Sequence, residues 1–178
     1  MQFEEVFALF GMYPEREEVV MAFRRYDSDK DDLLKYADLV KMFGPRDHRY
    51  CEVLTARKSF NEGRCYMRAR CFLPETMQDF QRLLLLVLNT EVRINNMKKS
   101  LTERKNFDMT KAFVACGGSA DGLSRIKPES LSKFLISHNF VASDRQVGWL
   151  FERMDRYANG EIDNADFKHG LSPFKLTY

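Results

Sequence analysis

The sequence has few cysteines, few histidines and no long apolar run. Its four cysteines, Cys51, Cys65, Cys71 and Cys116, form no CxxC pair, and no histidine stands at zinc-ligand spacing from them. This excludes a sequence-evident zinc site and favours free thiols in a reducing compartment. The longest apolar run, 83–88, is far too short to span a bilayer. The first residues are acidic and lack the basic segment of a signal peptide. These absences predict a soluble cytoplasmic protein.

A strong charge of one sign is also missing. The 28 basic and 26 acidic residues leave a net charge of +2, which indicates no class of partner. Basic residues are in excess only in the middle of the chain, where 12 Lys or Arg face 6 Asp or Glu between Ala56 and Lys111. Such an excess is either a solvated face or a surface for an acidic partner, such as a cytoskeletal polymer. No nucleic-acid-binding motif accompanies it, so we expect no nucleic-acid partner.

The sequence also lacks a recognisable catalytic constellation. His48 and Cys51 lie three residues apart on an expected helix, a spacing that a Cys–His pair could use. Nothing in the sequence supplies an oxyanion site or a third group that would orient the histidine. We therefore expect neither an enzyme nor a small-molecule substrate.

The most informative stretch that is present is the run 27–38, called the first loop below. It places Asp27, Asp29, Asp31 and Asp38 at the first, third, fifth and twelfth positions, and helical periodicity flanks it on both sides. Alternating carboxylates repel one another unless they converge on a hard cation that prefers oxygen ligands. This layout is typical of the calcium loop of an EF-hand.

Two further runs share this twelve-residue frame: the middle loop, 119–130, and the last loop, 155–166. An isoleucine stands at the eighth position of each. In the last loop Gly160 stands at the sixth position, where the backbone must turn sharply. In the middle loop serines replace the first and twelfth ligands and a leucine occupies the fifth position. We expect the middle loop to keep the shape of the others and to bind no calcium.

Apolar periodicity predicts the helices between and around these loops. It favours helices over 2–10 and 47–60 and a long helix over 75–103. The run 64–72 alternates basic and apolar residues, which indicates a strand with a basic face or, as the alternative, a basic helix. The block 83–88 is apolar on all sides and is expected to be buried on more than one of them.

Two helix starts also have a sequence signal. Asp108 is expected to cap a helix that leads into the middle loop. Ser143 and Gln146 have the spacing of a capping box and predict a helix over 144–154.

With these loops the chain resembles the calmodulin, centrin and calcineurin-B superfamily of EF-hand proteins. The resemblance implies an all-α fold of EF-hand helix–loop–helix units in two lobes, joined by a long helical middle segment, with short β bridges between paired loops. The expected domains are 1–45 with a half-hand and one EF-hand, 46–107 as a helical spacer with a basic segment, 108–172 as a pair of EF-hands, and a tail over 173–178. The mate of the first hand is expected either upstream of Met1 or on another protein.

The resemblance also implies a set of metal ligands. They are Asp27, Asp29, Asp31, the carbonyl of Leu33 and Asp38 in the first loop, and Asp155, Asn159, the carbonyl of Glu161, Asp163 and Asp166 in the last loop. Asp32 replaces the glycine of the sixth position, and aspartate tolerates φ > 0 at some cost. Asp38 is shorter than the usual glutamate, which suits six-coordinate Mg²⁺ better than seven-coordinate Ca²⁺. Tyr157 supplies no carboxylate at the third position of the last loop. We expect weak Ca²⁺ binding, with Mg²⁺ or no ion as the alternatives.

We expect a non-catalytic adaptor or structural protein, because the loops depart from the full ligand set, the first hand has no visible mate and the middle of the chain is basic and apolar. The nine Met and 15 Phe either fill the core, as such residues ordinarily do, or line surfaces that bind partner helices. The spacer 46–107 resembles that of calmodulin-like proteins of protist cilia and cytoskeleton, so we expect a large assembly of that kind as the partner and the location. The alternatives are a calcium sensor that captures a target helix and a light-chain-like regulatory subunit of an enzyme or motor.

Overall fold

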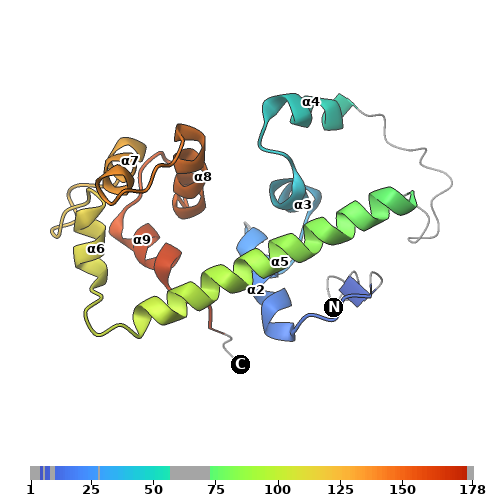
Figure 1. Ribbon diagram of the computed structural model, residues 1–178, viewed down its shortest axis with the longest axis horizontal. Helices are drawn as coiled ribbons and strands as arrows, with labels where there is room; N and C mark the ends of the chain where they lie inside the picture. The colour runs from blue at the N-terminus through green and yellow to red at the C-terminus, as the bar shows by residue number, and fades with distance from the viewer. Residues whose placement is uncertain (1–4, 6, 9–10, 28, 57–72, 176–178) are drawn as a thin grey trace. The chain divides into compact units, whose positions relative to one another are not determined.

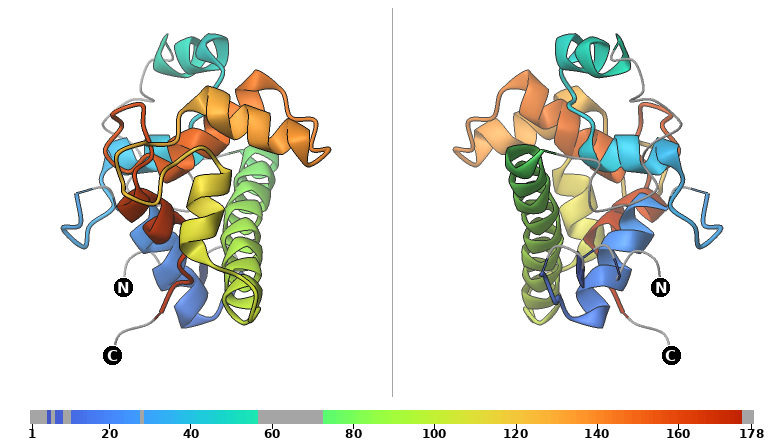
Figure 2. Two further views of the ribbon diagram at one scale, coloured as in Figure 1. Left: turned by 90° about the vertical axis from the view of Figure 1, so that its left-hand side faces the viewer. Right: turned by 90° about the vertical axis from the view of Figure 1, so that its right-hand side faces the viewer.

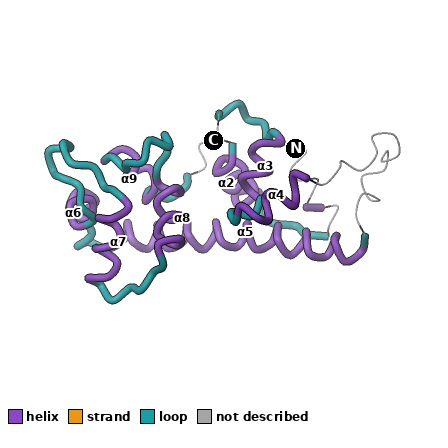
Figure 3. The backbone as a smooth tube through the Cα atoms, turned by 90° about the horizontal axis from the view of Figure 1, so that it is seen from above, coloured by secondary structure: helices purple, strands orange, loops and turns teal. Residues whose placement is uncertain are grey.

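The computed structural model of the chain describes residues 5, 7–8, 11–27, 29–56 and 73–175. In this part of the chain the backbone forms helices joined by loops (Figure 3). The helices are α2 (Arg16–Tyr26), α3 (Tyr36–Phe43), α4 (His48–Ala56), α5 (Pro74–Thr102), α6 (Met109–Ala115), α7 (Pro128–Ser137), α8 (Asp144–Met154) and α9 (Asn164–Leu171). The predicted all-α class is confirmed. The predicted basic strand over 64–72 lies outside the described residues.

The chain divides into two compact units, which are described separately. The first comprises Met1–Ile94 with Leu176–Tyr178, and the second comprises Asn95–Lys175. Helix α5 contributes residues to both units and is the long green helix of Figures 1 and 2. Its bounds agree closely with the helix predicted over 75–103. The predicted domain boundaries at 45, 107 and 172 stay a prediction.

The core of the first unit brings α2 and α5 together. Its buried side chains are Phe7, Val19, Ala22, Leu84 and Leu88. At the edge of this cluster the ring of Phe43, at the end of α3, meets that of Phe80 on α5, with centroids 5.3 Å apart in an edge-to-face arrangement. The first loop, which joins α2 to α3, is therefore anchored at both ends by packed helices.

The apolar block of α5 is buried along one stripe only. Leu84 and Leu88 are 2% and 4% exposed, whereas Leu85 and Leu86 are 40% and 64% exposed. Residues four apart on a helix share a face, while their immediate successors point elsewhere. The expectation that 83–88 is buried on more than one side is therefore wrong.

The second unit has its own core, made by α6–α9. The buried side chains are Phe113, Cys116, Ile126, Leu131, Val147, Phe151, Ile162 and Phe167. The rings of Phe113 and Phe167 meet edge to face, with centroids 5.5 Å apart. Ile126 and Ile162 form an isolated antiparallel bridge in which each backbone N–H donates to the other's carbonyl at 2.9 Å. This bridge joins the middle loop to the last loop.

Helix starts in the second unit agree with the sequence signals. The Asp108 Oδ1 accepts the backbone N–H of Lys111 at 2.9 Å and so caps α6. The Ser143 Oγ accepts the backbone N–H of Gln146 at 3.3 Å, and the Gln146 Oε1 accepts that of Ser143 at 2.9 Å. This is the predicted capping box of α8.

Of the helices that the structure describes, none combines the length and the apolarity that crossing a membrane requires.

Candidate metal centre

The first loop follows α2 directly and ends as α3 begins. Asp27 is the residue at which α2 stops, and Lys35 is the residue just before α3. Between them, Lys30 and Asp32 have φ angles of 58° and 59°. The left-handed conformation predicted at the sixth position is therefore present at Asp32, although it is not a glycine. These turns fold the chain back on itself, so that alternate side chains face the inside of the loop.

Three side-chain carboxylates of this loop accept backbone N–H groups of the same loop. The Asp27 Oδ2 accepts from Asp32 at 3.1 Å, spanning the first and sixth positions. The Asp31 Oδ1 accepts from Leu33 at 3.0 Å, spanning the fifth and seventh. The Asp38 Oδ2 accepts from Lys35 at 3.1 Å, spanning the twelfth and ninth. Each carboxylate thereby keeps one oxygen for another partner.

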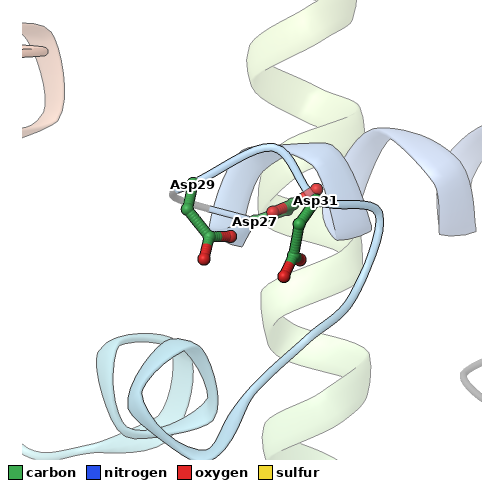
Figure 4. A group of neighbouring side chains, drawn as sticks. All are labelled: Asp27, Asp29 and Asp31. Atoms are coloured by element: carbon green, nitrogen blue, oxygen red, sulfur yellow. The ribbon is translucent and has the colours of Figure 1, made fainter.

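The predicted ligands Asp27, Asp29 and Asp31 come together. Each offers an oxygen within 4.8 Å of the oxygens of the other two, on the inner side of the curved loop in Figure 4. Asp27 is only 7% exposed, and its Oδ1 has no hydrogen-bond partner among the described residues. A buried carboxylate oxygen without a partner is costly and is expected to be satisfied by an ion or an ordered water. Three carboxylates that converge in this way have the chemistry to hold a hard divalent cation.

The two other predicted ligands of the first loop lie differently. Asp38 is 4% exposed but is not part of the converging group. Its Oδ2 is engaged by the N–H of Lys35 at the start of α3. The Leu33 side chain is exposed, and its backbone N–H donates to Asp31. The structure thus brings three of the five predicted ligands of this loop together.

Lys35, at the ninth position of the first loop, was not among the predicted site residues. Its Nζ forms ion pairs with the Oδ2 atoms of both Asp29 and Asp31. Hydrogen bonds to these carboxylates raise the pKa of Lys35 above its usual range. The hydrogen bond from Lys35 likewise lowers the pKa of Asp29. A lysine within a loop that carries several carboxylates was the available signal, because opposite charges this close in a short loop attract each other.

The last loop repeats the backbone arrangement of the first. Ala158 and Gly160, at its fourth and sixth positions, have φ angles of 51° and 77°. The Asp155 Oδ2 accepts the N–H of Gly160 at 2.8 Å, and the Asn159 Oδ1 accepts that of Glu161 at 3.0 Å. The Asp166 Oδ2 accepts the N–H of Asp163 at 3.5 Å. These contacts join the same pairs of positions as the three hydrogen bonds of the first loop.

The last loop has fewer carboxylates turned toward a common point. The Asp163 Oδ1 accepts the N–H of Asp166 at 2.8 Å and caps α9. The Glu161 carboxylate forms ion pairs with Arg125 at 3.2 Å and Lys127 at 3.6 Å, both from the middle loop. Tyr157 is 66% exposed. In the described part of the chain, the converging group of the first loop has no counterpart here.

Asp166 nevertheless has the electrostatic character of a ligand. It is 2% exposed, and its Oδ1 has no hydrogen-bond partner within the described ranges. Burial raises the pKa of its carboxyl, and the charges of Asp163 and Asp155 raise it further. A cation beside this carboxylate would relieve both effects.

The middle loop is closed by its own side chains. The Ser119 Oγ accepts the N–H of Ser124 at 2.7 Å, spanning the first and sixth positions, and donates to Asp121. The Asp121 Oδ1 also accepts the N–H of Leu123 at 3.0 Å. A serine hydroxyl thus replaces the first carboxylate of the other loops. The expectation that this loop binds no calcium stays a prediction.

No protein family, no curated protein and no solved structure matches the chain. The assignment of a function therefore rests on the residues and geometry described above.

Proposed function

We propose that the chain is a non-catalytic adaptor of the EF-hand type, which binds other proteins in a larger assembly and holds Ca²⁺ weakly, with Mg²⁺ as the alternative ion. One observation carries this proposal. The first and last loops share three side-chain-to-backbone hydrogen bonds and two left-handed positions, and each keeps a buried carboxylate oxygen, on Asp27 and on Asp166, without a described partner.

The proposal of weak binding rests on the ligands themselves. Asp29 and Asp31 are engaged by Lys35, so a cation at the first loop must displace an existing ion pair. Tyr157 leaves the last loop without a carboxylate at its third position. The affinity of such loops for a cation is lower when they have fewer charged ligands. A cation in either loop would then have a structural or modulatory role and would not act as a strong conformational switch.

The proposal of protein binding rests on exposed apolar side chains in both units. In the first unit they include Leu33, Tyr36, Val40, Tyr50, Val53 and Leu54. In the second unit Ile136, Phe140 and Val141 are 64%, 69% and 97% exposed within six consecutive residues. Contact with a protein partner would remove this apolar surface from water.

Calorimetric titration of the whole protein with Ca²⁺ and Mg²⁺ tests the cation sites. We expect heat from the wild type and a loss of more than about tenfold in affinity at the first loop for Asp27→Asn, because a buried charged ligand is removed. The matched control is Asp121→Asn, which removes a carboxylate from the middle loop and should leave binding unchanged. Wild-type protein that gives no heat with either ion would overturn the proposed cation sites.

Affinity purification of the native protein, in calcium and in chelator, tests the adaptor. Recovery of the same ciliary or cytoskeletal complex in both conditions is the expected result. Recovery in calcium alone would instead favour a calcium sensor, and recovery of a large ATPase would favour a light-chain-like subunit. A protein that remains monomeric and associates with no assembly contradicts the proposal.

A further inference from the structure

Lys35 places a positive charge among the carboxylates of the first loop. Its ammonium contacts one oxygen of Asp29 and one of Asp31, two of the three residues that converge there. We propose that Lys35 is a tethered competitor of the divalent cation: it neutralises the loop when no cation is bound and must leave both carboxylates when one binds. This inference rests on the proposed cation site and concerns how that site is controlled.

The corresponding residue of the last loop shows what is particular to Lys35. The ninth position of that loop is Asp163, whose side chain turns back to cap α9. In the first loop the backbone N–H of Lys35 donates to Asp38, while the side chain is free to extend across the loop to the carboxylates. Because the backbone contact does not involve the ammonium, the charge of Lys35 can be removed with the start of α3 intact.

The ion pairs of Lys35 are exposed to solvent, so that a cation can displace them. The side chains of Lys35 and Asp29 are each 52% exposed, and that of Asp31 is 33% exposed. Ion pairs this accessible to water are weak, so a divalent cation can displace them at moderate concentration. The two states compete, because an ammonium and a divalent cation held by the same small group of carboxylates repel each other. The Asp27 Oδ1, which is buried and has no described partner, is a ligand that only the cation would gain.

The first test compares cation affinity in two matched variants of the full chain. Lys35→Gln removes the ammonium and keeps a polar side chain, and we expect it to tighten Ca²⁺ binding at the first loop by about threefold to thirtyfold, from two exposed ion pairs. Lys30→Gln removes the same charge from the same loop. Lys30 is exposed and forms no ion pair within the described residues. We expect its affinity to stay within about twofold of the wild type.

The second test follows Lys35 directly in the wild-type protein. Acetylation by an activated acetate ester at low extent, measured peptide by peptide by mass spectrometry, reports how available each ammonium is. Lys35 should react faster in saturating Ca²⁺ than in chelator, because the cation releases it from the carboxylates, while Lys30 should react equally in both.

Three outcomes would overturn the inference. If Lys35→Gln binds Ca²⁺ no more tightly than the wild type, Lys35 does not compete with the cation, and the proposed cation site is unaffected by this result. If Lys30→Gln gains as much Ca²⁺ affinity as Lys35→Gln, the gain comes from the lower positive charge of the loop and not from removal of the Lys35 ammonium from the site. Failure of the wild type and both variants to bind any divalent cation removes the cation site itself, and the inference with it.

Discussion

At the scale of single residues, Asp108 shows how one side chain sets the start of a helix. It is exposed, and its Oδ1 accepts the N–H of Lys111 in the first turn of α6. Backbone hydrogen bonds, first from Lys111 and then from Thr110, lower the pKa of this carboxyl from its ordinary 3.8. A carboxyl with a lowered pKa in the folded state stabilises that state wherever the carboxylate is ionised. Its contribution is therefore present above pH 3.8 and lost as the pH falls through the lower folded value.

We predict that Asp108→Ala lowers the melting temperature at pH 7, because the first N–H groups of α6 lose their acceptor. The difference from the wild type should shrink as the pH falls below 3.8, where the carboxylate becomes protonated. Asp108→Asn keeps a capping oxygen without a titratable charge and serves as the control. Thermal melts from pH 7 to pH 2 measure all three proteins. A deficit of Asp108→Ala that persists unchanged at the acid end would contradict the assignment.

In the first loop, some residue positions could be predicted from the sequence and one could not. The left-handed backbone expected at Asp32 is present, because it follows from the frame of the loop. The convergence of Asp27, Asp29 and Asp31 also follows from their alternation. The position of the Lys35 ammonium did not emerge from the ligand pattern, since a long flexible side chain has many rotamers and its partner depends on the folded loop.

At the scale of elements, the middle loop and the last loop act as one structural pair. Ile126 and Ile162 are each 1% exposed and exchange two backbone hydrogen bonds. Arg125 and Lys127, on either side of Ile126, form ion pairs with Glu161 beside Ile162. The middle loop, closed by its own serine, can therefore support the last loop with or without a cation. The paired isoleucines stand at the eighth position of each loop, and both are part of the buried core of the unit.

We predict that Ile162→Ala lowers the free energy of unfolding by about 2–5 kcal/mol, through the loss of buried methyl groups and the cavity that remains. Leu123→Ala is the control, because Leu123 lies in the middle loop with 85% of its side chain exposed. Its effect should stay within about 0.5 kcal/mol. Urea unfolding followed by circular dichroism measures both variants. A similar loss in the free energy of unfolding for both variants would show that the isoleucine pair does not stabilise the contact between the middle loop and the last loop.

Helix α5 illustrates the limit of periodicity as a guide to burial. Its bounds could be predicted from Pro74 and from apolar positions repeated at helical spacing. The residues of its apolar block that face the core could not be predicted, because every side of 83–88 is apolar and no periodic contrast remains. The choice of Leu84 and Leu88 depends on where Phe7, Val19 and Ala22 pack against the helix.

At the scale of the whole molecule, a contact distant in sequence ties the end of the second unit to α5. The Asn95 Oδ1 accepts the backbone N–H of Phe174 at 2.7 Å. Asn95 is 7% exposed, so the amide lies largely away from water. The chain that follows α9 is thereby fixed to the part of α5 that belongs to the same unit.

We predict that Asn95→Ala destabilises the second unit by about 1–3 kcal/mol, since the Phe174 N–H would lose the Asn95 amide oxygen as an acceptor. Asn96→Ala is a matched control, because it makes the same change at the next position of the helix, where the side chain is exposed. Hydrogen exchange of the Phe174 amide, together with urea unfolding, measures the effect. Exchange at Phe174 that is equally slow in both variants would rule out the contact.

The sequence alone determined the features that depend on near neighbours. The caps at Asp108 and Ser143, the extent of α5 and the turn at Asp32 follow from hydrogen bonds and periodicity within a few residues. Only the tertiary structure decided the contact of Asn95 with Phe174 and the buried stripe of α5. These join segments far apart along the chain, and packing selects them from many alternatives that the sequence leaves equally open.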